Sequence, residues 1–164
     1  MATNDYLRLN ATNAATSDTD QWGAGMTSTV IGLRASYSTV ASTDTVAYCF
    51  AAIPGYSAFG SYTGSGSADG PFVYTGFRPA YVLTKNTGSG GWVILDNKRD
   101  AYNVSGNILQ AGSSAAELPV ASYPTMDIVS NGFKIRSSTI QNTSSATYIY
   151  VAFAENPFKY SLAR

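Results

Sequence analysis

Several residue types on which protein chemistry often depends are missing from this sequence or are rare in it. The 164-residue chain has no histidine, one cysteine at position 49, and no apolar run long enough to cross a membrane. Without histidine it lacks Ser-His-Asp and Cys-His triads, and one cysteine makes neither a thiolate metal site nor an intrachain disulfide. We therefore expect no enzyme activity, no metal or other cofactor, and no membrane partner.

Charged residues are also scarce. They make up 12% of the chain, and ten basic side chains balance ten acidic ones. No cluster of Lys and Arg is present, so we expect no nucleic acid partner. Glycoside hydrolysis needs two facing carboxyl groups, for which Asp96 and Asp100 are a conceivable pair, but most acidic residues stand where strands and turns meet.

What the chain contains in quantity is typical of strands and turns. Tyrosine occurs twelve times, and Ser, Thr, Asn and Gly separate short apolar runs. This pattern predicts an all-β fold, an antiparallel β-sandwich of jelly-roll or concanavalin-like form, with about ten strands and little or no helix. The expected strands are 5–10, 28–34, 45–52, 57–64, 71–77, 80–86, 91–97, 107–110, 125–131, 133–138 and 147–155.

The connections between the expected strands point to one domain. The segment "NTGSGG" (86–91) predicts a hairpin loop, and "SNG" (130–132) predicts a tight turn in which Gly132 is free to take a positive φ. No linker divides the chain. We therefore expect a single domain over residues 1–164, with residues 1–27 as a partly irregular N-terminal arm.

Two distant segments have similar sequences. "VAYCFAAIPGY" (46–56) and "IYVAFAENPFKY" (149–160) share a Phe-Ala pair followed by a proline. Nearly continuous apolar runs are typical of central strands, and proline lacks the N–H that would extend a ladder. We predict that both segments form central strands and that Cys49, inside the first, is a buried and inert thiol.

One polar segment is the strongest candidate for ligand contact. "LDNKRDAYN" (95–103) follows an apolar run and combines carboxylates, amides and an aromatic ring, which suits either a shallow sugar site or a Ca²⁺ site. Its basic residues oppose a cation, and a charged exposed loop with local salt bridges is the favoured alternative. The candidate ligand-binding residues are Asp96, Asn97, Arg99, Asp100, Tyr102 and Asn103.

The two tryptophans have different settings. Trp92 stands at an alternating position of an expected strand, which favours a place in the core. Trp22 lies in the polar N-terminal arm, where it either fills a groove of its own domain or contacts a neighbouring chain. We treat Trp22 as a candidate interface residue.

Three longer pieces of the sequence resemble a known family. "GSADGPFVYTGFRPA" (66–80), "SNGFKIR" (130–136) and "YVAFAENPF" (150–158) resemble the C-terminal domain of structural proteins of tailed bacteriophages, which is usually found next to concanavalin-like lectin domains. The likeness extends over nearly the whole chain. It carries no catalytic or ligand residues that could be assigned to positions here.

The resemblance implies a role in a virion rather than a reaction. It implies a module of a tail fibre, spike or other appendage that contacts the host surface, with a surface glycan as a candidate ligand. The expected partners are other virion proteins and further copies of the chain, most simply in a trimer, and the expected location is the virion. The alternative is a capsid or tail decoration protein, or cement protein, without a host ligand.

Overall fold

The structure, a computed structural model, describes residues 5–18, 27, 29–32, 44, 46–119, 121 and 123–157. The chain forms two compact units, residues 1–8 with 15–50 and residues 9–14 with 51–164. The first unit contains a pair of short antiparallel strands, β1 (Asp5–Tyr6) and β2 (Thr16–Ser17). Within the described ranges all ten strands are antiparallel and no helix occurs, which confirms the predicted all-β class. None of these residues belongs to a helix that could span a membrane.

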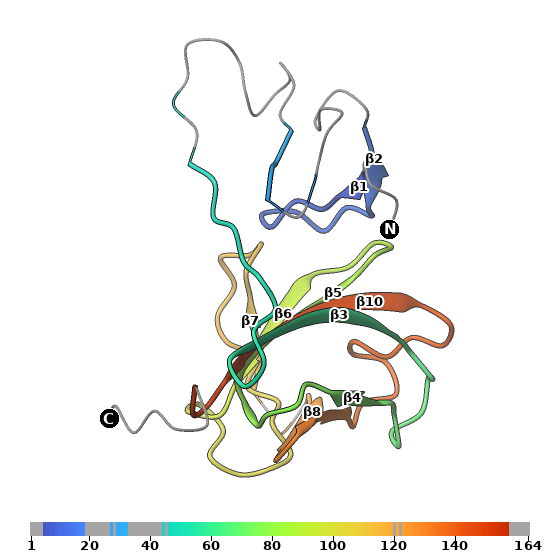
Figure 1. Ribbon diagram of the computed structural model, residues 1–164. Coiled ribbons are helices and arrows are strands. Elements are labelled where there is room, and N and C mark those ends of the chain that lie inside the picture. Colours follow the sequence, from blue (N-terminus) through green and yellow to red (C-terminus); the bar gives the residue numbers. More distant parts are fainter. Residues whose placement is uncertain are drawn as a thin grey trace. The chain divides into compact units, whose positions relative to one another are not determined.

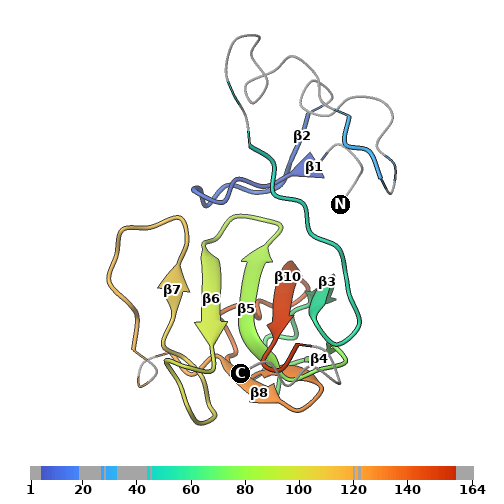
Figure 2. The ribbon, with the colours of Figure 1, turned by 60° about the vertical axis from the view of Figure 1, so that its left-hand side comes forward.

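Two antiparallel sheets build the second unit. The five-stranded sheet has the order β3 (Ser57–Thr63), β10 (Thr147–Ala154), β5 (Pro79–Asn86), β6 (Trp92–Asp96) and β7 (Leu109–Gln110). The three-stranded sheet has the order β4 (Phe72–Tyr74), β9 (Gly132–Ile135) and β8 (Met126–Val129). Figure 1 shows β4 and β8 in a second layer beneath the larger sheet, and Figure 2 shows β7, β6, β5, β10 and β3 side by side.

The core lies between these two layers. Side chains alternate along each strand, so Tyr148, Tyr150 and Ala152 of β10 are buried on one face of the five-stranded sheet. Phe133 of β9 packs edge-to-face against Tyr150, with ring centroids 5.5 Å apart. The arrangement is consistent with the predicted β-sandwich. The finer jelly-roll form stays a prediction.

Two glycines allow the strands to approach each other closely. A Cβ atom at Gly60 would lie 2.9 Å from the Tyr150 ring, so glycine here makes room for that ring. Gly132 is free to take a positive φ, but it is not among the glycines with that conformation. A Cβ atom at Gly132 would instead collide with the carbonyl oxygen of Val73 in β4, and close strand contact is the reason for glycine.

The central position predicted for residues 147–155 is confirmed, because β10 pairs with β3 on one side and β5 on the other. The matching prediction for residues 45–52 is wrong. Residues 46–52 form no strand and are exposed, with Tyr48 83% and Phe50 67% accessible. No strand of the described residues pairs with them. Cys49 is therefore exposed rather than buried.

Other differences concern the N-terminal part of the chain. Of the strand expected over residues 28–34, residues 29–32 are described and form none. The short strand β2 was not predicted, since a two-residue strand in a polar segment leaves no periodic pattern. Trp22 lies outside the described residues, and its place at an interface remains a prediction.

Candidate functional site

The loop that follows β6 uses its first carboxylate to hold its own backbone. Asp96 accepts hydrogen bonds from the Lys98 and Arg99 amides at 2.9 and 2.8 Å, and from Arg99 Nε at 2.6 Å. Burial opposes ionisation of Asp96, but these hydrogen bonds prevail and lower the pKa of its carboxyl group. Arg99 also forms a salt bridge with Glu117 at 2.9 Å, which ties the loop to the segment that follows β7.

The remaining polar candidates are engaged in the same way. Asp100 accepts hydrogen bonds from the Gly106 and Asn107 amides at 2.9 and 2.8 Å. Asn103 exchanges two hydrogen bonds with the backbone of Ile128 in β8, which ties the loop to the smaller sheet. Asn97 donates to Glu155 at 2.8 Å. Most polar groups of the loop are therefore already used to fix its shape.

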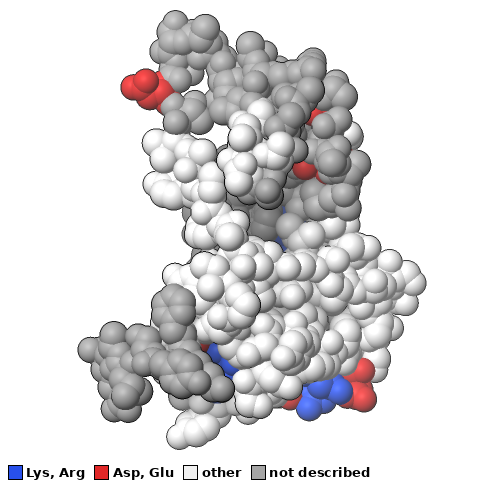
Figure 3. Space-filling model, viewed as in Figure 1, with Lys and Arg blue, Asp and Glu red and all other residues white. Residues whose placement is uncertain are grey.

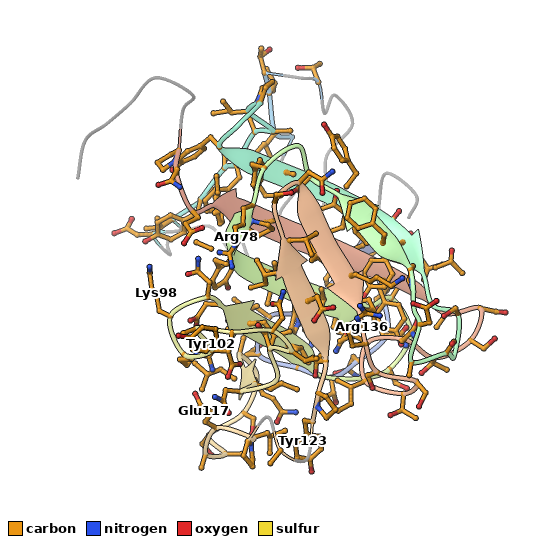
Figure 4. All side chains as sticks on the ribbon, turned by 90° about the horizontal axis from the view of Figure 1, so that it is seen from below. Arg78, Lys98, Tyr102, Glu117, Tyr123 and Arg136 are labelled. Atoms are coloured by element: carbon orange, nitrogen blue, oxygen red, sulfur yellow. The ribbon has the colours of Figure 1, made fainter. Side chains whose placement is uncertain are left out.

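Tyr102 is the candidate that the loop presents to solvent, with 88% of its surface exposed. Figure 4 shows Lys98 projecting from the same loop, with Tyr102 and Glu117 on that side of the ribbon and Arg136 away from them. Across the described part of the chain, no three Asp, Glu or Cys side chains gather closely enough to hold a metal ion. The six candidate residues lie in one loop because they are neighbours in the sequence. Their role in ligand binding stays a prediction.

A separate pocket of about 290 Å³ lies at the end of the sandwich where β5 ends and β6 and β10 begin. Its walls come from the β5–β6 hairpin loop, from β6 and β7, and from the loop that precedes β10. The lining residues are Asn86, Ser89, Gly90, Gly91, Val93, Ile108, Gln110, Leu118, Tyr123, Thr139, Ile140, Gln141, Thr143 and Tyr148. None of these side chains is charged.

Three polar groups at this pocket have unused hydrogen-bonding capacity. Gln110 is the last residue of β7, and its side-chain amide makes no hydrogen bond with the described residues. Gln141 is 8% exposed, and its Oε1 atom has no donor within the described structure. The Tyr148 hydroxyl accepts from the Thr143 amide at 3.0 Å and from Asn86 at 3.4 Å, which leaves its own hydrogen available.

The pocket wall formed by residues 139–145 is held firmly. The buried Tyr62 hydroxyl donates to the Gln141 carbonyl at 2.8 Å, and the Tyr62 ring stacks on Tyr148 at 5.2 Å. Burial, with a smaller contribution from Tyr148, raises the pKa of Tyr62, so its phenol keeps the proton that it donates. Asn142 is fully buried and donates to Ser67 and Ser137 carbonyls at 2.7 Å each. The wall therefore exists before any ligand arrives.

Sequence reasoning missed this pocket. Its polar residues are single amides and hydroxyls in five separate segments, and none forms a motif by itself. The expected hairpin loop at 86–91 was the only local signal, and it indicated a turn rather than a binding wall. Only the pairing of β10 with β5 brings Tyr148 beside Asn86.

Comparison with known proteins gives one match. Neither the curated proteins nor the solved structures contain a significant match to this sequence. A family described as a domain of unknown function, DUF7483, matches residues 1–157. That span includes both compact units almost completely, and on this basis the chain belongs to the DUF7483 family.

Proposed function

We propose that this chain is a structural module of a bacteriophage virion, within a tail fibre, spike or similar appendage that contacts the host surface. The sequence resemblance supports this role. Two of the resembling pieces, residues 66–80 and 130–136, contribute β4 and β9, which pair with each other in the smaller sheet. The third piece, residues 150–158, contributes the end of β10, so the resemblance falls on both sheets.

The observation that carries the proposal is the exposed apolar segment 46–54. All nine of its residues are exposed, among them Val46 at 74%, Tyr48 at 83% and Phe50 at 67%. Large apolar side chains exposed in a row mark a contact surface, because water around them is displaced favourably when a partner covers them. A module built into a larger assembly has such a partner.

A second apolar surface lies beside the strand that follows this segment. A groove of about 450 Å³ runs between residues 52–59 and Tyr74–Gly76, and it contains Ile53, Pro54 and Phe59. Tyr74 is 67% exposed. The strands that flank the groove, β3 and β4, are the end strands of their sheets. A neighbouring copy that inserts an apolar segment here would cover this groove.

Low charge favours the same role. Figure 3 shows a largely uncharged face, with basic and acidic side chains together at its lower edge. Salt bridges of this kind join Asp69 to Lys134 at 2.6 Å and to Arg136 at 3.4 Å. Surfaces with few charged residues and many tyrosines associate with a small desolvation cost, because charged residues are depleted and aromatic residues are enriched at interface cores. Closed symmetry would use one such surface several times, and we expect a trimer.

Light scattering on the purified chain tests self-assembly. We expect a mass three times that of the 17.3 kDa chain at micromolar concentration. The double variant Tyr48→Ser with Phe50→Ser should shift the mass toward a monomer, because it removes two exposed apolar side chains. Tyr102→Ser is the matched control, since Tyr102 is equally exposed but lies on another loop.

A monomeric wild-type chain would contradict self-assembly. A second measurement places the chain in the particle: mass spectrometry of separated heads and tails from virions that carry it should find it in the tail fraction. Its presence in the head fraction would favour a decoration protein instead. Its absence from virions would overturn the proposed function altogether.

A further inference from the structure

We infer that the pocket between the β5–β6 hairpin, β7 and the 139–143 loop binds a neutral saccharide. This inference rests on the proposed function for the source of the ligand, a glycan of the host surface. The physical case for the pocket stands on its own contacts. The inference places glycan binding in this pocket, whereas the sequence pointed to the 95–103 loop.

The lining excludes strongly charged ligands. Its fourteen residues include no Lys, Arg, Asp or Glu, so a phosphate, sulfate or carboxylate would lose its hydration without gaining a charged partner. A metal ion would likewise find no carboxylate among them. The fitting ligand is uncharged and polar.

The unused hydrogen-bonding groups favour hydroxyls in particular. Gln110 supplies an amide that both donates and accepts, and Tyr148 supplies an O–H hydrogen whose oxygen already accepts two hydrogen bonds. Gln141 Oε1 needs a donor, which a ligand hydroxyl would provide after rotation about the last side-chain bond. A hydroxyl group donates and accepts at one atom, so a ring with several hydroxyls matches this mixed set.

The apolar part of the lining suits the other face of a sugar. Val93, Leu118 and Ile140 line the same pocket, and Tyr123 adds an aromatic ring. Sugar rings carry C–H groups that pack against such surfaces while their hydroxyls reach polar groups. The volume of about 290 Å³ lies near the lower limit of ligand pockets and suits one or two sugar units. The groove beside β3 is larger but lined mainly by apolar residues.

The pocket also requires little ordering on binding. Tyr62 holds the Gln141 carbonyl at 2.8 Å, and Asn142 ties the same loop to two distant carbonyls. Rigid walls lower the entropy that binding would otherwise cost, which matters for a weak ligand with few contacts.

An array of neutral and acidic glycans, followed by calorimetric titration with the best neutral one, tests the inference on the full chain. We expect binding to neutral glycans, with an affinity that changes little from low to high salt because no ion pair forms. Gln110→Ala should weaken binding about tenfold, since it removes one amide whose side chain makes no hydrogen bond with the described residues. Free monosaccharides, titrated separately, distinguish a single sugar from a polymer as the ligand.

Two further variants make the test specific. At Gly91, a Cβ atom would lie 3.6 Å from Gln110 Nε2, an ordinary contact, so Gly91→Ala narrows the pocket without a clash and should also weaken binding several-fold. Asn131→Ala is the control, because it removes an exposed amide from the turn before β9 and should leave affinity unchanged. Circular dichroism and melting curves check that all variants fold.

The outcomes separate this inference from the proposed function. Saccharide binding that Gln110→Ala and Gly91→Ala leave unchanged, or that Tyr102→Ala abolishes, would overturn the pocket assignment. A flat glycan array, or binding of a peptide library that these variants weaken, would also overturn it. The proposed structural role is tested separately. It stands, whatever the saccharide result, if the chain forms trimers and is found in virion tails.

Discussion

Residues 46–54 and 147–155 have similar sequences but different structures. Phe50-Ala51 in the first corresponds to Phe153-Ala154 in the second, and each run is followed by a proline, Pro54 and Pro157. The second stretch is almost entirely the central strand β10. The first forms no strand, and all its side chains are exposed.

The difference shows that an apolar run becomes a buried strand only where other strands receive it. β10 has antiparallel partners on both sides, with Val151 opposite Phe59 of β3 and Leu83 of β5. Its Tyr148, Tyr150 and Ala152 meet the smaller sheet across the core. Residues 46–52 have no described strand beside them, and a partner chain is what we propose covers them.

The largest expected effect is the loss of stability when Phe153 is truncated, compared with the same truncation of Phe50. Phe153 packs against Tyr56, Phe59 and Tyr81, with centroids 6.1 Å away in each case. Phe153→Ala should lower the free energy of unfolding by about 3 kcal/mol, at the low end for phenylalanine because the ring is only partly buried. Phe50→Ala should change it by no more than about 0.5 kcal/mol. Urea unfolding at a protein concentration too low for assembly measures the free energy of unfolding of both variants.

Equal effects of these two substitutions would remove the contrast between the stretches. A large loss for Phe50→Ala in a monomer would mean that residues 46–54 pack within their own chain. The same substitution should weaken the trimer, because in the assembly Phe50 is proposed to lie at the interface.

A smaller effect is expected at high pH, and it tests the core around β10. Burial raises the pKa of Tyr150, and burial together with Tyr148 raises that of Tyr62. The folded chain keeps these protons while the unfolded chain, with ordinary values near 10, loses them. Stability is therefore complete below about pH 10 and falls above it, by at most about 1.4 kcal/mol per pH unit for each tyrosine.

Tyr62→Phe serves as the comparison in that experiment. It should cost about 1 kcal/mol at neutral pH, because the Gln141 carbonyl loses its donor. Its stability should then decline less steeply above pH 10 than that of the wild-type chain. Identical slopes would show that Tyr62 ionises freely and is not enclosed by the core. Burial lowers the pKa of Lys85, so this residue makes stability rise with pH rather than fall. Its contribution is the same in the wild-type chain and in Tyr62→Phe.

The smallest expected effect is a change in the rate at which a thiol reagent labels Cys49. This thiol lies in the middle of the exposed stretch. A small thiol reagent should label the native monomer within a few-fold of the rate for the denatured chain. Labelling should slow when the chain assembles, if residues 46–54 form the interface. Strong protection in the monomer would contradict the exposed conformation.

The candidate site was predictable only in part. The sequence alone shows that the 95–103 loop combines several polar residues, and their role in ligand binding stays a prediction. It does not reveal that Asp96, Asp100 and Asn103 bind the backbone of their own domain. The pocket was not predictable at all. Gln110 and Gln141 are separated along the chain and carry no motif, so their shared location depends on the pairing of distant strands.

The sequence by itself determined the all-β class, most of the strands from residue 57 onward, and the hairpin between β5 and β6, because side-chain alternation and turn residues are local properties. It also excluded histidine chemistry, since an absent side chain is absent from every fold. Tertiary structure alone decided which of the two similar apolar stretches is buried, that Cys49 is exposed, and where neutral polar groups meet in a pocket. Burial and strand pairing depend on neighbours that are distant in the chain, and no local pattern specifies them.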